Sequence, residues 1–372
     1  MKFRIVLSLF LLAGLVPFSK AEEPLPHDIF APSRKGSSLL WLMLSPSKDS
    51  EKPSASEMHL RETIDLGFGA RTITQHSEKP ILYISGGFGE ETGSNFAAVF
   101  LNEETREVQK IERMKVARDY SYVSLDREKK FLFGCSYGEG IIDVYRLDEN
   151  GVPNPEPVES LQEGRKAAHC VLVSPDNRHI YIPYVKEHNA LFQYAFEAKT
   201  GGLKALDPKN ANPPEKTGPR HLAYHPKLPL LYFSEEQGLG VSIYKRAEDG
   251  QLAYWKSASA VGDGAPEDGV SASDILMTPN GKFVYTGIRG HKHDFDFIAG
   301  YAVQDDGNLK PLKLTATEKI PWGLAVTKDS RFLVVTAFKG GKILAYQIGE
   351  DGALTQAAEL AVDENISDVE IR

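Results

Sequence analysis

The sequence predicts an all-β fold, a seven-bladed β-propeller with four-stranded antiparallel blades, on two observations. First, a unit of three β-rich runs separated by turns recurs six times between residues 76 and 350, at spacings of 49 to 53 residues. Second, each end of the chain carries part of one further unit. The residues that mark the end of the first run in each complete unit are His76, Leu125, Ser174, His225, Thr278 and Thr327.

Within a unit the runs have the composition of strands. Residues 171–173, 180–182 and 191–196 are rich in Val, Ile, Tyr, Phe and Leu, which favour pleated sheets. An acidic turn that usually ends in glycine follows the third run, as at Asp148–Gly151 and Asp305–Gly307. Glycine tolerates the positive φ of a tight hairpin, so we expect each turn to lead into a fourth strand.

The two ends of the chain together supply the seventh blade. Residues 367–372 have the pattern of a first strand that stops, whereas residues 38–44 and 58–64 resemble later strands that lack a first. Pairing them closes the ring and removes its exposed edges. Residues 38–372 are therefore predicted to form one propeller domain, with residues 22–37, which contain three prolines, as a flexible lead-in.

The first 21 residues have the features of a secretory signal peptide. Lys2 and Arg4 precede a short apolar stretch, and small residues lead to a cleavage point after Ala21. We therefore predict a periplasmic or secreted protein that does not insert into the membrane after cleavage. The remaining chain has 40 basic and 51 acidic residues, a net charge of −11, which argues against nucleic acid as a partner. The sequence does not indicate an oligomeric state.

Two further features were weighed as chemical sites. Cys135 and Cys170 are expected to be separate buried thiols, with a disulfide as the alternative. The segment from His291 to Asp296 contains two histidines and two aspartates, but one local group without distant ligands is weak evidence for a metal. A solvated loop is the preferred interpretation, and no metal or cofactor is predicted.

The repeat also predicts which residues meet at one end of the central channel. The loops that enter each first strand and those that follow each second strand emerge on the same face. Five residues before each marker stand Arg71, Tyr120, His169, Arg220, Ser273 and Trp322. Eleven residues after each marker stand Gly87, Ser136, Val185, Glu236, Arg289 and Phe338. Three guanidiniums beside one imidazole and one carboxylate predict a site for a small anionic ligand.

Four short motifs carry a resemblance to a known family. They are Ala168-His169-Cys170, Gly218-Pro219-Arg220-His221, Leu231-Tyr232-Phe233-Ser234-Glu235-Glu236 and Ile288-Arg289-Gly290-His291. In order and blade position they resemble the seven-bladed propeller lactonases, which include propeller-type 6-phosphogluconolactonases and fungal carboxymuconate lactonising enzymes. The resemblance covers roughly residues 70 to 372. The chain departs from the family pattern where Glu235 and Ile288 replace asparagine and where Trp322 replaces arginine.

The resemblance implies a set of site residues and an activity. The implied catalytic residues are His169, Glu236, Arg220 and Arg289. From the ring positions and the motifs, we expect Arg71, Tyr120, Glu235, His291 and Trp322 to contact the substrate. The implied activity is hydrolysis of a small anionic or sugar-derived lactone by general acid–base catalysis, and the reverse, lactonising reaction would use the same groups.

Two further arguments bear on this function. The chain has no Gly-x-Ser-x-Gly motif, which disfavours a covalent serine mechanism. Export argues against an intracellular sugar-phosphate lactone as the substrate. Because fold does not fix function, a non-catalytic propeller that binds a ligand or a protein through the same channel mouth is the alternative.

Overall fold

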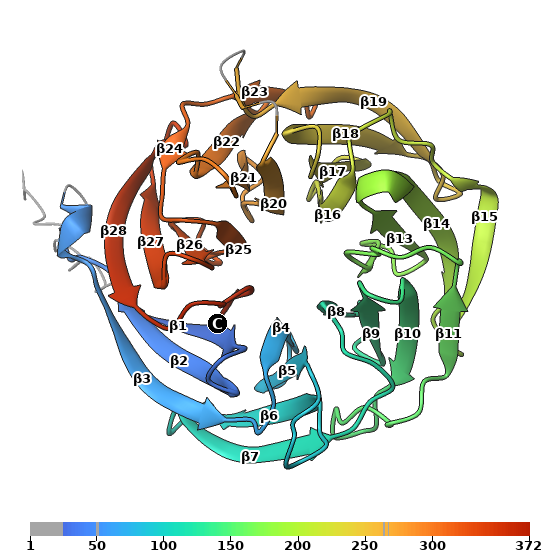
Figure 1. Cartoon of the computed structure of the whole chain (residues 1–372), viewed down its shortest axis with the longest axis horizontal. Helices are drawn as coiled ribbons and strands as arrows, with labels where there is room; N and C mark the ends of the chain where they lie inside the picture. The colour runs from blue at the N-terminus through green and yellow to red at the C-terminus, as the bar shows by residue number, and fades with distance from the viewer. Residues whose placement is uncertain (1–24, 50–51, 263–264, 267) are drawn as a thin grey trace, which may run out of the picture.

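Seven antiparallel sheets stand in a ring around a central channel in the computed structural model (Figure 1), which describes residues 25–49, 52–262, 265–266 and 268–372. This confirms the predicted seven-bladed propeller. The signal peptide predicted for residues 1–21 lies outside the described residues.

The six blades formed from continuous chain are, from the channel outwards, β4 (Ala70–Gln75), β5 (Ile81–Gly86), β6 (Phe96–Asn102) and β7 (Glu107–Met114); β8 (Tyr122–Leu125), β9 (Phe131–Ser136), β10 (Ile141–Arg146) and β11 (Glu159–Gln162); β12 (Leu172–Val173), β13 (His179–Tyr184), β14 (Ala190–Glu197) and β15 (Gly202–Asn210); β16 (Pro219–Tyr224), β17 (Leu230–Glu235), β18 (Gly240–Arg246) and β19 (Leu252–Ser259); β20 (Val270–Met277), β21 (Phe283–Gly290), β22 (Phe297–Val303) and β23 (Leu309–Pro311), with β24 (Thr315–Ala316) also paired to β22; and β25 (Pro321–Val326), β26 (Phe332–Ala337), β27 (Lys342–Ile348) and β28 (Leu354–Ala361). Two 3₁₀ turns, η1 (Pro53–Ala55) and η2 (Lys186–His188), lie in loops.

The seventh blade joins the two ends of the described chain. Its innermost strand is β29 (Glu370–Ile371), which pairs with β1 (His27–Ser33), followed by β2 (Ser38–Ser45) and β3 (Glu57–Asp65). The predicted closure of the ring is therefore confirmed. The prediction of a flexible lead-in over residues 22–37 is wrong for residues 27–33, because the apolar run around Phe30 outweighs the nearby prolines and is buried as a strand.

A repeated tyrosine contact ties each of four blades to the next. The tyrosine comes from the second strand of one blade, and its hydroxyl donates to the carbonyl of the glycine that ends the acidic turn of the following blade. The pairs are Tyr83 with Gly151 (2.7 Å), Tyr181 with Gly250 (2.6 Å), Tyr232 with Gly307 (2.8 Å) and Tyr285 with Gly352 (2.8 Å). These glycines have φ of 82° to 90°, so the turns have the backbone geometry that the sequence predicted.

The two cysteines are separate. Cys135 and Cys170 are both free and fully buried, which confirms the prediction of separate thiols. Burial raises the pKa of each thiol, so neither is an activated nucleophile. Among the described residues, no helix has the length and apolar character required to cross a bilayer.

The tyrosine contact predicts the effect of a single substitution. Tyr181→Phe leaves the buried carbonyl of Gly250 without its donor, which is expected to lower the free energy of unfolding by about 1–3 kcal/mol. Urea titration measures the loss. Tyr254→Phe is the control, because that hydroxyl contacts Ser257 at the exposed surface. Equal stability of the two variants would contradict the assigned role of the contact.

Candidate active site

Irregular pairing of the innermost strands shapes the channel wall. The register shifts lie between Pro219 and Leu222 in β16 and between Ala272 and Ile275 in β20. Such bulges redirect side chains that regular alternation would turn away. As a result, His221 and Asp274 both line the cavity at the end of the channel, although each directly follows a position that was assigned to the mouth.

A cavity of about 410 Å³ lies at this end of the channel. Its wall includes residues from several different blades. The predicted site residues that line it are Arg71, His169, Glu236, Arg289, His291 and Trp322. The structure therefore brings together six of the nine residues named from the sequence.

Glu236 lies between two buried guanidiniums. Its Oε2 is 3.2 Å from Nε of Arg220 and 3.6 Å from Nη2 of Arg289. Both arginines also lie over the ring of Trp322, with Cζ atoms 5.7 Å (Arg220) and 4.7 Å (Arg289) from its centroid. Burial, together with the charge of Arg220, lowers the pKa of Arg289 to about 9, while Glu236 opposes the shift.

Arg220 itself does not form part of the cavity wall. Its side chain has no exposed surface, and none of its three guanidinium nitrogens has a hydrogen-bond partner with good geometry. Arg289 lines the cavity and donates from Nη2 to the carbonyl of Ala272 at 2.6 Å. Of the two arginines, Arg289 is therefore the one placed to touch a ligand, whereas Arg220 acts through its charge.

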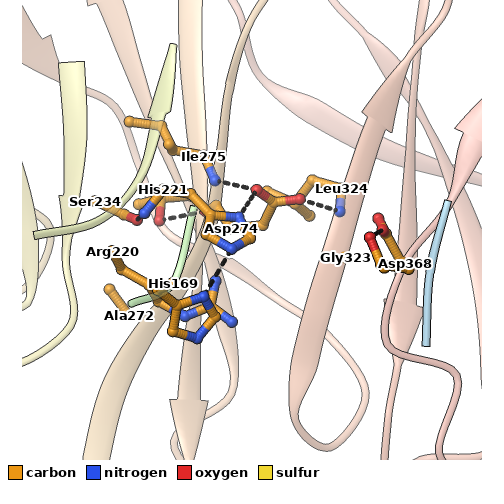
Figure 2. A network of polar contacts seen from close by, with 12 residues as sticks. His169, Arg220, His221, Ser234, Ala272, Asp274, Ile275, Gly323, Leu324 and Asp368 are labelled. Carbon is orange, nitrogen blue, oxygen red and sulfur yellow. Dashed lines mark hydrogen bonds and ion pairs between the residues drawn. The ribbon is translucent and has the colours of Figure 1, made fainter. Parts of the chain in front are cut away.

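His169 belongs to a chain of three polar side chains (Figure 2). Its Nδ1 lies 3.0 Å from Nε2 of His221, and Nδ1 of His221 lies 2.7 Å from Oδ1 of Asp274. Burial and the nearby Arg220 lower the pKa of both imidazoles, most strongly that of His169. Both rings are therefore neutral at neutral pH.

A second cationic group lines the opposite part of the wall. Arg71 forms an ion pair with Asp119 at 2.7 Å. Arg34, in the turn between β1 and β2, stacks over Phe338 at 5.5 Å, and its buried Nε has no hydrogen-bond partner. Burial and the charge of Arg71 lower the pKa of Arg34 to about 10. Both guanidiniums line the cavity.

The structure does not place Tyr120 in the cavity, which corrects that prediction. Tyr120 is fully buried, and its hydroxyl contacts Asp143 and Tyr145 within the blade. The error is a slip of one residue in the second repeat. The N–H of Asp126 bonds to the carbonyl five residues later, as the N–H of His225 does, so Asp126 is the equivalent marker.

The corrected marker moves both ring positions of that blade by one residue. Ser121 and Tyr137 then take the places assigned to Tyr120 and Ser136, and both line the cavity. The ring of Tyr137 packs edge-on against His169 at 5.3 Å. Because side chains alternate along a strand, a slip of one residue exchanges a channel residue for a buried one.

Glu235 also lies away from the cavity, which corrects the prediction that it contacts the substrate. It is the last residue of β17, and its carboxylate accepts a hydrogen bond from Ser257 in β19 of the same blade. Alternation at the strand end sends Glu236 to the channel and Glu235 into the blade. Burial raises the pKa of Glu235 accordingly.

Sequence reasoning missed several residues of the cavity wall. His221 stood within a quoted motif without a role, and Lys186 follows the position assigned to Val185. The missed wall residues with ionisable side chains are Arg34, Tyr122, Tyr137, Lys186, His221, Asp274 and Asp368. His291 lines the wall as expected, with Nε2 2.8 Å from the hydroxyl of Ser271. Within the described ranges, no group of three or more His, Cys, Asp and Glu residues is arranged to hold a metal.

Fold and site together define a seven-bladed propeller with a histidine, glutamate and arginine cavity at one end of its channel. The family model described as lactonase, seven-bladed beta-propeller, matches residues 53–369, so the chain belongs to that family. A 6-phosphogluconolactonase of Enterobacter sp. (strain 638) is 29% identical over 249 residues, which cover 65% of this chain and 71% of the relative.

Solved structures share the whole propeller. A periplasmic gluconolactonase from Pseudomonas aeruginosa superposes with a TM-score of 0.79 at 18% identity, covering 93% of this chain and 99% of that one. A Lactobacillus plantarum protein superposes with a TM-score of 0.70 at 17% identity, covering 93% and 99%. At these identities the likeness shows the fold.

Proposed function

We propose that the chain is an exported lactonase that opens a small anionic or sugar-derived lactone by general acid–base catalysis in this cavity. The observation that carries the proposal is the arrangement of the wall: a neutral His169 shares one cavity with Arg289 and Glu236. Membership of the lactonase family and the name of the Enterobacter relative support the reaction class.

In the proposed reaction, His169 serves as the general base. It removes a proton from water as the water oxygen attacks the lactone carbonyl carbon. When the ring carbon–oxygen bond breaks, His169 returns the proton to the departing alkoxide, which becomes the hydroxyl of the open acid. Glu236 is the poorer base because two guanidiniums hold its carboxylate.

Arg289 is assigned to the oxyanion. It lines the cavity, and its buried position strengthens its interaction with a developing negative charge. Glu236 holds Arg289 in place and balances the charge of Arg220, which would otherwise be an uncompensated buried cation. Arg220 in turn keeps His169 neutral by disfavouring its protonated form.

Arg71 and Arg34 are assigned to an anionic substituent or to the hydroxyls of the substrate. Asp119 satisfies part of the charge of Arg71, and Nε of Arg34 has no hydrogen-bond partner. A carboxylate or phosphate would gain charge-assisted hydrogen bonds from both guanidiniums. His291 and Trp322, which also line the cavity, complete the proposed substrate contacts.

Export is proposed from the signal-like features of residues 1–21. The periplasmic Pseudomonas protein shows that this fold occurs outside the cytoplasm. N-terminal sequencing of the chain recovered from its native host checks the assignment. A mature protein that begins at Glu22 is expected, and retention of Met1 would contradict export by cleavage.

Activity should depend on His169. In a pH-stat assay on a panel of lactones, His169→Ala is expected to lower kcat by about 10²–10⁴-fold, because that is the range a positioned base contributes. The depressed pKa of His169 also places the acidic limb of the kcat/KM profile well below pH 6.5. The matched control is His59→Ala, at an exposed position of β3. If wild type opens no lactone, the non-catalytic binding alternative is favoured instead.

Substrate choice should depend on Arg71. Arg71→Ala is expected to raise KM for a lactone that carries a carboxylate or phosphate by about tenfold, since a charge-assisted hydrogen bond contributes about 1.5–3 kcal/mol. KM for an uncharged sugar lactone should change much less. Arg61→Ala, at an exposed arginine of β3, is the control. Equal losses on charged and uncharged substrates would show that Arg71 does not read the substituent.

A further inference from the structure

We propose that Asp274, acting through His221, fixes His169 in the tautomer whose Nε2 is unprotonated and available to the cavity. Asp274 and His221 are then positioning residues. The tautomer follows from hydrogen bonding alone, whereas its use in catalysis rests on the proposed lactonase function.

The chain of inference begins at Asp274, which accepts three hydrogen bonds (Figure 2). The N–H of Ile275 donates to Oδ1 at 2.8 Å, and the N–H of Leu324 donates to Oδ2 at 3.0 Å. The third donor is Nδ1 of His221. Burial alone would raise the pKa of Asp274, but His221, the Leu324 N–H and Arg220 bring it below its ordinary value. The group is therefore a carboxylate and only accepts.

The carboxylate fixes the proton of His221. A neutral imidazole carries one N–H and one lone pair, and His221 is neutral because burial and Arg220 lower its pKa. Nδ1 lies 2.7 Å from the Asp274 carboxylate, so the proton must be on Nδ1. Nε2 of His221 is then an acceptor.

His221 fixes the proton of His169 in the same way. The two rings meet at Nδ1 of His169 and Nε2 of His221, 3.0 Å apart, and two lone pairs would repel each other there. Nδ1 of His169 therefore carries the proton and donates. Its Nε2 keeps a lone pair, has no hydrogen-bond partner among the described residues, and is the ring nitrogen left to the cavity that His169 lines.

The chain contains two histidines that must adopt the opposite tautomer. Nδ1 of His76 accepts from the N–H groups of Glu78 and Lys79 at 3.1 and 3.0 Å. Nδ1 of His225 likewise accepts from two backbone N–H groups of its own turn at 3.0 and 2.8 Å. Both rings must therefore carry their proton on Nε2 when neutral. They serve as internal references.

The direct test is ¹⁵N NMR of the full chain labelled at histidine, at a pH where the rings are neutral. Signals are assigned with single histidine substitutions. We expect the proton on Nδ1 in His169 and His221, and on Nε2 in His76 and His225. A proton on Nε2 of His169 would overturn the proposal, whatever the activity of the protein.

A second test separates positioning from folding. His221→Phe keeps a ring of similar size but removes the acceptor, and it is expected to move the proton of His169 away from Nδ1. We expect kcat to fall by about 10²-fold or more, with KM changed less than about threefold, because the lost effect belongs to proton transfer. His59→Phe, in exposed β3, is the control.

Asp274→Asn provides the same readouts if His221→Phe does not fold. An unchanged His169 tautomer or an unchanged kcat in a folded variant would overturn the positioning role. If wild type opens no lactone, the proposed function fails, and the NMR spectrum alone decides the tautomer assignment.

Discussion

Closure of the ring by β29 and β1 is the constraint on which the rest of the structure depends. Ile371 and Glu370 pair with Ile29 and Phe30, so the described chain ends against its own beginning. A blade packs against two neighbours, and only a closed ring gives every blade both. The closing segment also reaches the next blade, because Asp368 accepts hydrogen bonds from the hydroxyl of Thr72 and the N–H of Ile73.

Closure brings together charges that would otherwise repel or remain hydrated. The chain as a whole is acidic, with a net charge of −8, yet one end of the channel gathers four arginines. Glu236 offsets two of them, and the face of Trp322 offers both of these guanidiniums a cation–π contact. Burying this cluster costs free energy, which only specific pairing limits. An anionic ligand would complete the pairing.

The sequence predicted the fold well because a propeller repeats. Six registered units and two partial ends identified the blade count, the closure and the face that carries the site. The error at Tyr120 came from one turn: Leu125 was taken as the marker, whereas the hydrogen bond of the turn starts at Asp126. The missed strand β1 is short and lies among prolines.

His221 and Asp274 were missed for a different reason. Regular alternation allows one channel residue where the bulges in β16 and β20 allow two. A bulge depends on pairing with the neighbouring strand, which a single sequence does not display. The pairing of His169 with His221 and Asp274 is therefore a property of the assembled ring.

The most direct measurement of the central claim is a crystal structure of the protein with an aldonic acid, the product of a sugar lactone. We expect the product carboxylate in the cavity, within hydrogen-bonding distance of Arg289 and facing Nε2 of His169. A product bound elsewhere, with the cavity lined by His169, Glu236 and Arg289 left empty, would contradict the account.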